Sequence, residues 1–142
     1  MTVAEKHHKV QVVLFCELTQ SVLMLLTTPQ RGSIWQNITG SVEAGETFAQ
    51  AALRELHEET GLVLPPEQLE DLAWSFTFTD SKGRDVEEHC FLALSQKKFN
   101  AFVDKNEHER LWWKKIKYIN NKDFGFPSNF EAFTKAKIRW GK

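Results

Sequence analysis

Three glutamates at helical spacing are the residues of this sequence with the clearest capacity for chemistry. Glu55, Glu58 and Glu59 occupy positions i, i+3 and i+4 of a segment, residues 47–61, that reads as a helix. They therefore share one face, where like charges repel by roughly 0.2–0.5 kcal/mol per pair on an exposed helix and by more when desolvated. A bound divalent cation reverses the sign of that repulsion. Hard carboxylate oxygens with no Cys or His on the same helix face favour Mg²⁺, or Mn²⁺ in its place.

The three acids alone also fit a solvated charged face, because adjacent acidic residues are common on surface helices. The same segment carries an apolar stripe, rotated from the acids by roughly 120°. The stripe consists of Ala49, Ala52, Leu53 and Leu56. This arrangement predicts a helix that docks on a sheet and aims its carboxylates sideways into a cleft.

Residues on both sides of the acids weigh against a plain solvated face. Seven positions between Gly40 and Leu62 carry Gly, Glu or Arg at fixed spacing, as G-x5-E-x7-R-E-Leu-x-E-E-x-G-Leu. Each of these types has a usage of roughly 5–7%, so a chance match is very improbable. They are Gly40, Glu46, Arg54, Glu55, Glu58, Glu59 and Gly61.

This pattern is the complete Nudix box, and the chain resembles the Nudix hydrolase family. The resemblance implies hydrolysis of a diphosphate linked to another moiety, usually a nucleoside. It also implies the family's α/β fold, an α/β/α sandwich with a mixed sheet between helices. We expect one such domain over residues 1–142, with the box at residues 40–62.

The resemblance implies a role for each polar residue of the box. Glu55 and Glu59 match the principal metal ligands, and Glu58 matches a further ligand or a residue that acts on water. Glu46 and Arg54 match residues that orient the glutamates, which is how metal ligands are usually held.

The loop before the helix is expected to bring backbone close to the metal and phosphates. In the family, the residue before the first glycine offers its carbonyl to the metal, and here that residue is Thr39. Gly40 adds no Cβ, so the chain can approach closely at this point.

Residues 35–47 resemble a narrower branch of the family, the bacterial dihydroneopterin triphosphate pyrophosphatases. The likeness continues at residues 91–94, in the pair Glu107-His108, at Trp112 and in Ser128-Asn129. It implies that Glu107 is a further metal ligand or the base. The chain departs from the branch in having one arginine, Arg31, where the branch has a pair, and in a shorter stretch at residues 79–88. Both places are expected to contact the variable end of the substrate.

Four residues are candidates for substrate binding, and three of them have ordinary structural alternatives. Arg31 can grip phosphate or remain solvated. Trp35 can stack on a planar ring or fill the core beside the box. Asn129 can bind ligand or cap the last helix. Gly40 is the fourth candidate, through its backbone.

Hydrophobic periodicity and turn residues predict alternating strands and helices, which favours layers of helix on a mixed sheet. Phe76 and Phe78 alternate along one strand and are expected in the core. The C-terminal helix should begin at Pro127 and present Phe130, Phe133 and Ile138 on one face. Strands are expected at 10–18, 22–27, 34–38, 72–79, 86–94 and 111–116, helices at 47–61 and 127–138, and an irregular acidic loop at 99–109.

Bulk properties set limits on location and partners. With 18 basic and 19 acidic residues, the net charge of −1 gives no general electrostatic grip on nucleic acid or membrane. No apolar run is long enough for a membrane span or signal peptide, so the cytoplasm is the expected location. Cys16 and Cys90 lie in apolar runs and are expected to be buried free thiols. His7 and His8 are expected in a mobile terminus rather than a metal site.

Two classes of function fit the sequence. The first is an enzyme in which water attacks phosphorus of a small nucleotide-like diphosphate, most like dihydroneopterin triphosphate. Other substrates of the same chemistry are ADP-ribose-type sugars, NTPs, dinucleoside polyphosphates and RNA 5′-ends. The second class is a non-catalytic nucleotide-binding module, which would be expected to have lost box glutamates, whereas all are present. The sequence leaves formation of an oligomer open.

If the helix-borne acids hold a catalytic cation, Glu55→Gln or Glu59→Gln should abolish turnover and leave the fold intact. Phosphate release and thermal melts, each with and without Mg²⁺, check this. Full activity in either variant would refute the assignment of these acids as metal ligands.

Overall fold

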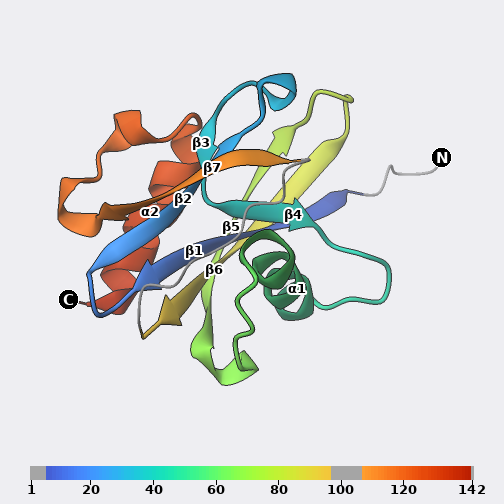
Figure 1. Cartoon of the computed structure of the whole chain (residues 1–142). Helices are drawn as coiled ribbons and strands as arrows, with labels where there is room; N and C mark the ends of the chain where they lie inside the picture. Colours follow the sequence, from blue (N-terminus) through green and yellow to red (C-terminus); the bar gives the residue numbers. More distant parts are fainter. Residues whose placement is uncertain (1–5, 97–106, 142) are drawn as a thin grey trace.

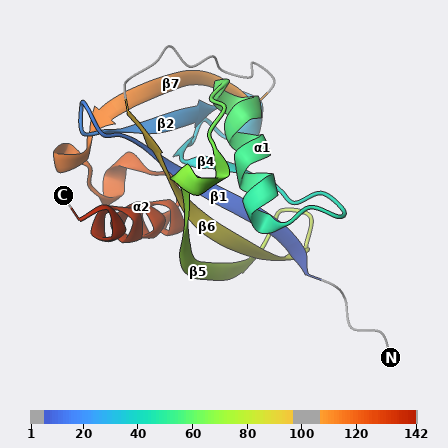
Figure 2. The same cartoon turned by 90° about the horizontal axis from the view of Figure 1, so that it is seen from below.

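A mixed sheet forms the middle layer of the chain, with one helix on each of its faces (Figures 1 and 2). The structure is a computed structural model, and it describes residues 6–96 and 107–141. Helix α1 (Phe48–Thr60) covers one face and helix α2 (Pro127–Trp140) the other. The strands are β1 (His7–Cys16), β2 (Ser21–Thr27), β3 (Trp35–Gln36), β4 (Ile38–Ser41), β5 (Leu69–Thr79), β6 (Asp85–Ser95) and β7 (His108–Lys115).

Strand β1 is the spine of the sheet. It pairs in parallel with β6 along its whole length, and antiparallel with β4 on its first half and with β2 at its end. Its alternate side chains enter different cores: Val10 and Val12 pack under α1, whereas Val13 and Phe15 pack against α2. Burial on both faces explains why this strand reads as an almost continuous apolar run.

The expected hairpin at residues 10–27 is confirmed, since β1 and β2 are antiparallel with Phe15 opposite Val22. β1 begins earlier than expected, however. His7 and His8 pair with β6, so their assignment to a mobile terminus was wrong. The reason is that β6 extends far enough to give these residues hydrogen-bonding partners, which periodicity within residues 1–10 does not reveal.

The single strand expected at 34–38 is two strands, β3 on β2 and β4 on β1. Asn37 lies between them, and the chain changes its partner strand there. Strand β7 begins at His108, inside the segment expected to be a loop, because it pairs with β2 from Thr27 onward. Residues 99–106 of that expected loop lie outside the described residues.

Three aromatic or aliphatic side chains are less buried than expected. Phe76 is partly buried against the α2-side core and Phe78 is exposed, because both face a cavity rather than the sheet interior. Ile138 points to solvent, whereas Phe133 is buried and Phe130 packs beside it. Both cysteines are buried free thiols, as expected. Among the described residues, no helix is long and apolar enough to cross a membrane.

Helix α1 begins and ends where local signals place it. The Thr47 hydroxyl accepts from the Gln50 backbone N–H at 3.1 Å, and the Gln50 side chain accepts from the Thr47 backbone N–H at 2.9 Å. Gly61 ends the helix in the left-handed conformation at φ 82°, where a side chain would be strained. This capping box fixes the start of the helix that carries the acidic residues.

Thr47→Ala should lower the free energy of unfolding by about 1 kcal/mol, because the N-terminal amides of α1 lose their cap. Urea unfolding followed by circular dichroism measures this. Ser81→Ala truncates an exposed hydroxyl in the turn before β6 and should change stability by less than about 0.5 kcal/mol. Equal effects from the two variants would contradict the role of the cap.

Candidate active site

Strand β4 and helix α1 approach each other most closely at Gly40. A Cβ at this position would overlap the carboxyl group of Glu55, so only glycine lets the strand lie against that side chain. The contact places the backbone of Thr39 and Gly40 beside an acid of the helix. The two halves of the sequence pattern, the glycine loop and the acidic helix, therefore meet in space.

Arg54 ties the loop to the helix. Its guanidinium donates to both oxygens of Glu46, at 2.7 and 3.0 Å, and to the backbone carbonyl of Ser41 at 2.8 Å. It also donates to Glu55 at 2.8 Å and to Glu58 at 3.2 Å. The hydrogen bond from Arg54 lowers the pKa of Glu46, and the Glu46 carboxylate in turn raises the pKa of Arg54. The network holds two of the three helix glutamates in fixed orientations.

Glu59 is the most buried acid of the site, with 2% of its surface exposed. Neither of its carboxylate oxygens has a hydrogen-bond partner among the described residues. Burial raises its pKa well above the ordinary value, and the carboxylates of Glu55 and Glu107 raise it further. Burial likewise raises the pKa of Glu55. An unpaired, buried carboxylate beside other acids is unfavourable unless a cation or a proton compensates it.

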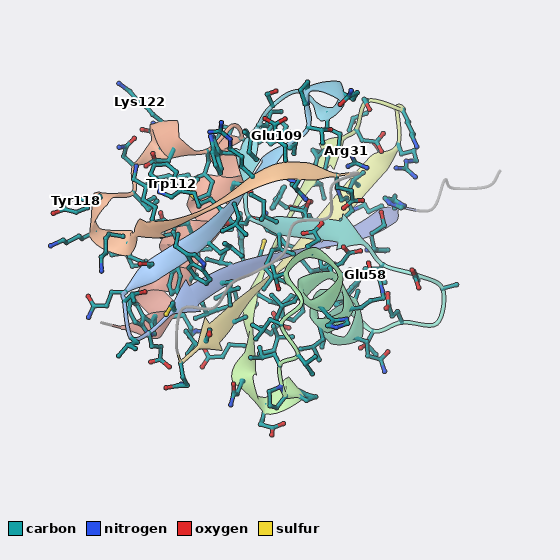
Figure 3. The ribbon with its side chains drawn as sticks, in the orientation of Figure 1. Arg31, Glu58, Glu109, Trp112, Tyr118 and Lys122 are labelled. Atoms are coloured by element: carbon teal, nitrogen blue, oxygen red, sulfur yellow. The ribbon has the colours of Figure 1, made fainter. Side chains whose placement is uncertain are left out.

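The helix is rotated relative to the arrangement expected from the sequence. Ala49 is exposed and Ala51 is buried, so the acids do not lie 120° from the docking face. Glu55 and Glu59 share the buried face with Ala51, and only Glu58, whose side chain is 52% exposed, points outward (Figure 3). The helix wheel could not reveal this, because the glycine opposite Glu55 lets the carboxylates lie under β4.

The fourth acid comes from the start of β7. Glu59, Glu107 and His108 each offer one ligand atom, and these three atoms lie within 4.8 Å of one another. Thr28 holds this segment through a backbone hydrogen bond to the Glu107 carbonyl, at 3.2 Å. Arg31 reaches the Glu107 carboxylate at 3.5 Å, near the start of β7 (Figure 3). The structure thus brings Glu55, Glu59 and Glu107 together from distant parts of the sequence.

A cavity of about 530 Å³ opens beside Thr39, on the α2 side of the sheet. Three phenylalanines line it, together with polar groups from β1, β6 and the start of α2. Asn129, a candidate from the sequence, is among the lining residues, whereas Trp35 and Arg31 are not. Trp35 instead packs edge-on against Trp112, with ring centroids 5.7 Å apart. The phenylalanines are Phe76, Phe78 and Phe126.

Buried polar side chains connect the two ends of this cavity. The Gln11 amide donates to Glu88 at 2.7 Å, and its oxygen accepts from Asn37 at 2.8 Å. The Asn37 backbone N–H then donates to the side-chain oxygen of Asn129 at 2.8 Å. None of the four residues is more than 4% exposed. Sequence reasoning missed Gln11, Asn37 and Glu88; the one local signal was a glutamine inside an otherwise apolar run.

The acids near Gly40 fit a divalent metal ion. The buried Glu59 carboxylate lacks donors, the other ligand atoms are mostly oxygen, and a carbonyl-bearing strand lies alongside. Hard oxygen ligands of this kind suit Mg²⁺ or Mn²⁺. When bound, such an ion supplies charge neutralisation for a diphosphate and activates water.

A comparison with protein families settles the class of this chain. The family model of the NUDIX domain matches residues 6–133. The chain belongs to the NUDIX domain family. The resemblance noted in the sequence is therefore confirmed, as is the predicted sandwich of a mixed sheet between helices.

Individual Nudix relatives and other matching proteins differ in how much of the chain they share. Dihydroneopterin triphosphate diphosphatase of Escherichia coli (strain K12) is 47% identical over 58 residues, 41% of this chain and 38% of that protein. Octanoyltransferase of Myxococcus xanthus is 53% identical over 57 residues, 40% of this chain and 15% of that protein. The chain thus spans less than half the length of either relative in these matches.

A solved structure matches over much more of the chain. The E. coli dihydroneopterin triphosphate pyrophosphohydrolase superposes with a TM-score of 0.80 at 27% identity. The match covers 93% of this chain and 95% of that chain. The common architecture therefore includes both helices and the sheet that place the acids and the cavity.

Glu59→Gln should stabilise the metal-free chain by about 1–3 kcal/mol at neutral pH, because it removes a buried charge without partners. The gain should be small near pH 4.5, the ordinary pKa of the group, and grow as pH rises. The raised pKa means that the folded state holds the proton to higher pH than the unfolded state, so wild-type stability falls with rising pH.

Thermal melts of the metal-free protein across pH test this, and Mg²⁺ should then stabilise wild type but not the variant. Glu58→Gln is the matched control on the same helix, with an expected change of less than about 0.5 kcal/mol, since that side chain is exposed. Destabilisation by Glu59→Gln without metal would contradict the account.

Proposed function

We propose that this chain is a Mg²⁺-dependent pyrophosphohydrolase, with Mn²⁺ able to replace Mg²⁺. The observation that carries the proposal is the Glu59 carboxylate, which is buried without hydrogen-bond donors among the described residues and lies close to the carboxylates of Glu55 and Glu107. Glu55 and Glu59 are the main ligands in this proposal, with the Thr39 carbonyl, Glu58 and Glu107 completing the set as the reaction requires. A binding module would gain nothing from an unpaired buried acid.

The residues around the metal site divide the remaining work. Arg54 and Glu46 keep Glu55 and Glu58 oriented, and Gly40 lets the β4 backbone, which in this proposal contacts the diphosphate, lie against Glu55. Water attacks phosphorus, one phosphoanhydride P–O bond breaks, and the proton of the water passes to a carboxylate. Glu107 suits that role, because its side chain is 35% exposed and so can meet incoming water.

The cavity beside Thr39 is the proposed site for the variable end of the substrate. Its phenylalanines can hold a planar ring by stacking. Glu88 offers a carboxyl acceptor, and Asn129, whose oxygen is engaged by Asn37, has its amide N–H groups left to donate. An acceptor and a donor that line one cavity match a 2-amino-4-oxo pyrimidine edge, as in a pterin or guanine, which has two donors next to one carbonyl.

This match favours dihydroneopterin triphosphate over adenine-containing substrates such as ADP-ribose. The branch resemblance in the sequence and the similarity to the E. coli pyrophosphohydrolase point the same way. The products would be pyrophosphate and the corresponding monophosphate. A small nucleotide-like molecule also fits the near-neutral net charge of −1 better than a long nucleic acid does.

A phosphate-release assay with Mg²⁺ over a panel of diphosphate substrates tests the proposal. Inorganic pyrophosphatase converts the pyrophosphate released from triphosphates, and alkaline phosphatase converts the monophosphates released from ADP-ribose. Dihydroneopterin triphosphate and GTP should exceed ATP and ADP-ribose in kcat/KM. No turnover of any substrate, with metal binding retained, would favour the binding module. Preference for adenine compounds would support the pyrophosphohydrolase activity but overturn the assignment of the cavity to a pterin or guanine ring.

Glu88→Gln should lower kcat/KM for dihydroneopterin triphosphate by roughly 10–150-fold. The substitution replaces a carboxylate oxygen, which accepts from the N–H groups of the ring, with an amide NH2, which donates. It therefore removes a charged hydrogen bond to the ring. The Mg²⁺ dependence should be unchanged. Steady-state kinetics check this, with Glu70→Gln on β5 as the control for loss of an exposed strand carboxylate. An equal loss on ATP and dihydroneopterin triphosphate would contradict ring reading by Glu88.

A further inference from the structure

Two histidines and a glutamate converge on the α1 face of the sheet, away from the candidate active site. His8 lies on β1, and Glu87 and His89 lie on the parallel neighbour β6. His8 is in register with Glu87, and His89 follows two residues later on the same face. All three are partly buried, so they lie at the border between protein and solvent.

Two ring nitrogens of this group lack hydrogen-bond partners among the described residues. Among the described residues, neither His8 Nδ1 nor His89 Nε2 has a hydrogen bond, although both atoms are buried. Buried polar atoms in native proteins are nearly always satisfied by protein, water or an ion. Two unsatisfied imidazole nitrogens facing one carboxylate therefore point to a ligand that accepts electron pairs.

The distances suit a metal ion. Each of the three residues offers one ligand atom, and these atoms lie within 4.8 Å of one another. His89 Nε2 is 3.7 Å from Glu87 Oε1. The His89 ring stacks on Phe48 at 3.7 Å between centroids. Ser75 donates to Glu87 at 3.2 Å. Ring stacking and a hydrogen bond to the carboxylate hold ligands in place, as the surroundings of metal sites do.

Burial lowers the pKa of His89, and a metal ion binds the neutral form of an imidazole. The charges around it come from both neighbouring strands. Glu87 and Asp71 act against the lowering, and His8 adds to it. Lys6 lies 3.8 Å from Glu87 on its other side.

We propose that His8, Glu87 and His89 form a second metal site, for Zn²⁺ or another late first-row divalent ion. Two imidazoles and one carboxylate are a ligand set that such ions prefer, whereas Mg²⁺ prefers oxygen alone. The site shares no residue with the acids around Gly40. A metal held by these residues would join β1 to β6 beneath the first turn of α1.

The test is Zn²⁺ binding measured by competition with a chromophoric chelator, in the full chain carrying Glu59→Gln. That background weakens Zn²⁺ binding at the group of Glu59, Glu107 and His108, which also offers a nitrogen ligand. One Zn²⁺ should bind per chain. Adding His8→Gln or His89→Gln should weaken binding by at least about 100-fold, because even residues outside the ligand set contribute roughly 10–100-fold.

His7→Gln is the matched control, since His7 is the adjacent histidine on β1 and bonds Ser41 instead. It should leave Zn²⁺ affinity unchanged. Glu87→Gln provides a third ligand variant that keeps the His89–Phe48 stack, and circular dichroism verifies the fold of each protein. Zn²⁺ binding that survives all three ligand variants, or that is absent from the starting chain, would overturn the proposal.

Discussion

A carboxylate held away from water is the constraint around which this fold is organised. Glu59 lies on the docking face of α1, where an apolar residue would stabilise the fold more. The surrounding structure does not neutralise it with donors, but adds Glu55 and Glu107 beside it. Such an arrangement is unfavourable unless a cation or a proton compensates the charge, so stability has been given up at the position where the proposed chemistry occurs.

Strand β1 lies between the acids on the α1 side and the cavity on the α2 side, which bind the two ends of one substrate in the proposed function. Its first half pairs with β4, so Thr39 and Gly40 lie between the acids on the α1 side and the cavity on the α2 side. Gln11, on the same strand, carries the hydrogen-bond chain from Glu88 toward Asn129. A diphosphate bound at the acids can therefore extend past β4 and place its ring in the cavity.

Local signals in the sequence were sufficient for some elements and insufficient for others. The cap at Thr47 and the stop at Gly61 defined α1, because those interactions span only a few residues. The change of partner strand at Asn37 was not predicted, since it depends on where β1 and β2 diverge. The family resemblance, rather than any local signal, predicted that Glu107 joins Glu59 at the metal site. Glu88 was not predicted, because burial of a strand carboxylate depends on partners distant in sequence.

The central claim, that these acids form the cation site for pyrophosphate cleavage, is tested most directly by crystals grown with Mn²⁺. Anomalous scattering locates the ion without reference to activity. The account predicts a peak in contact with the carboxylates of Glu55 and Glu59 and near the Thr39 carbonyl. An ion bound only elsewhere, or none at these side chains in crystals that still convert substrate, would contradict it.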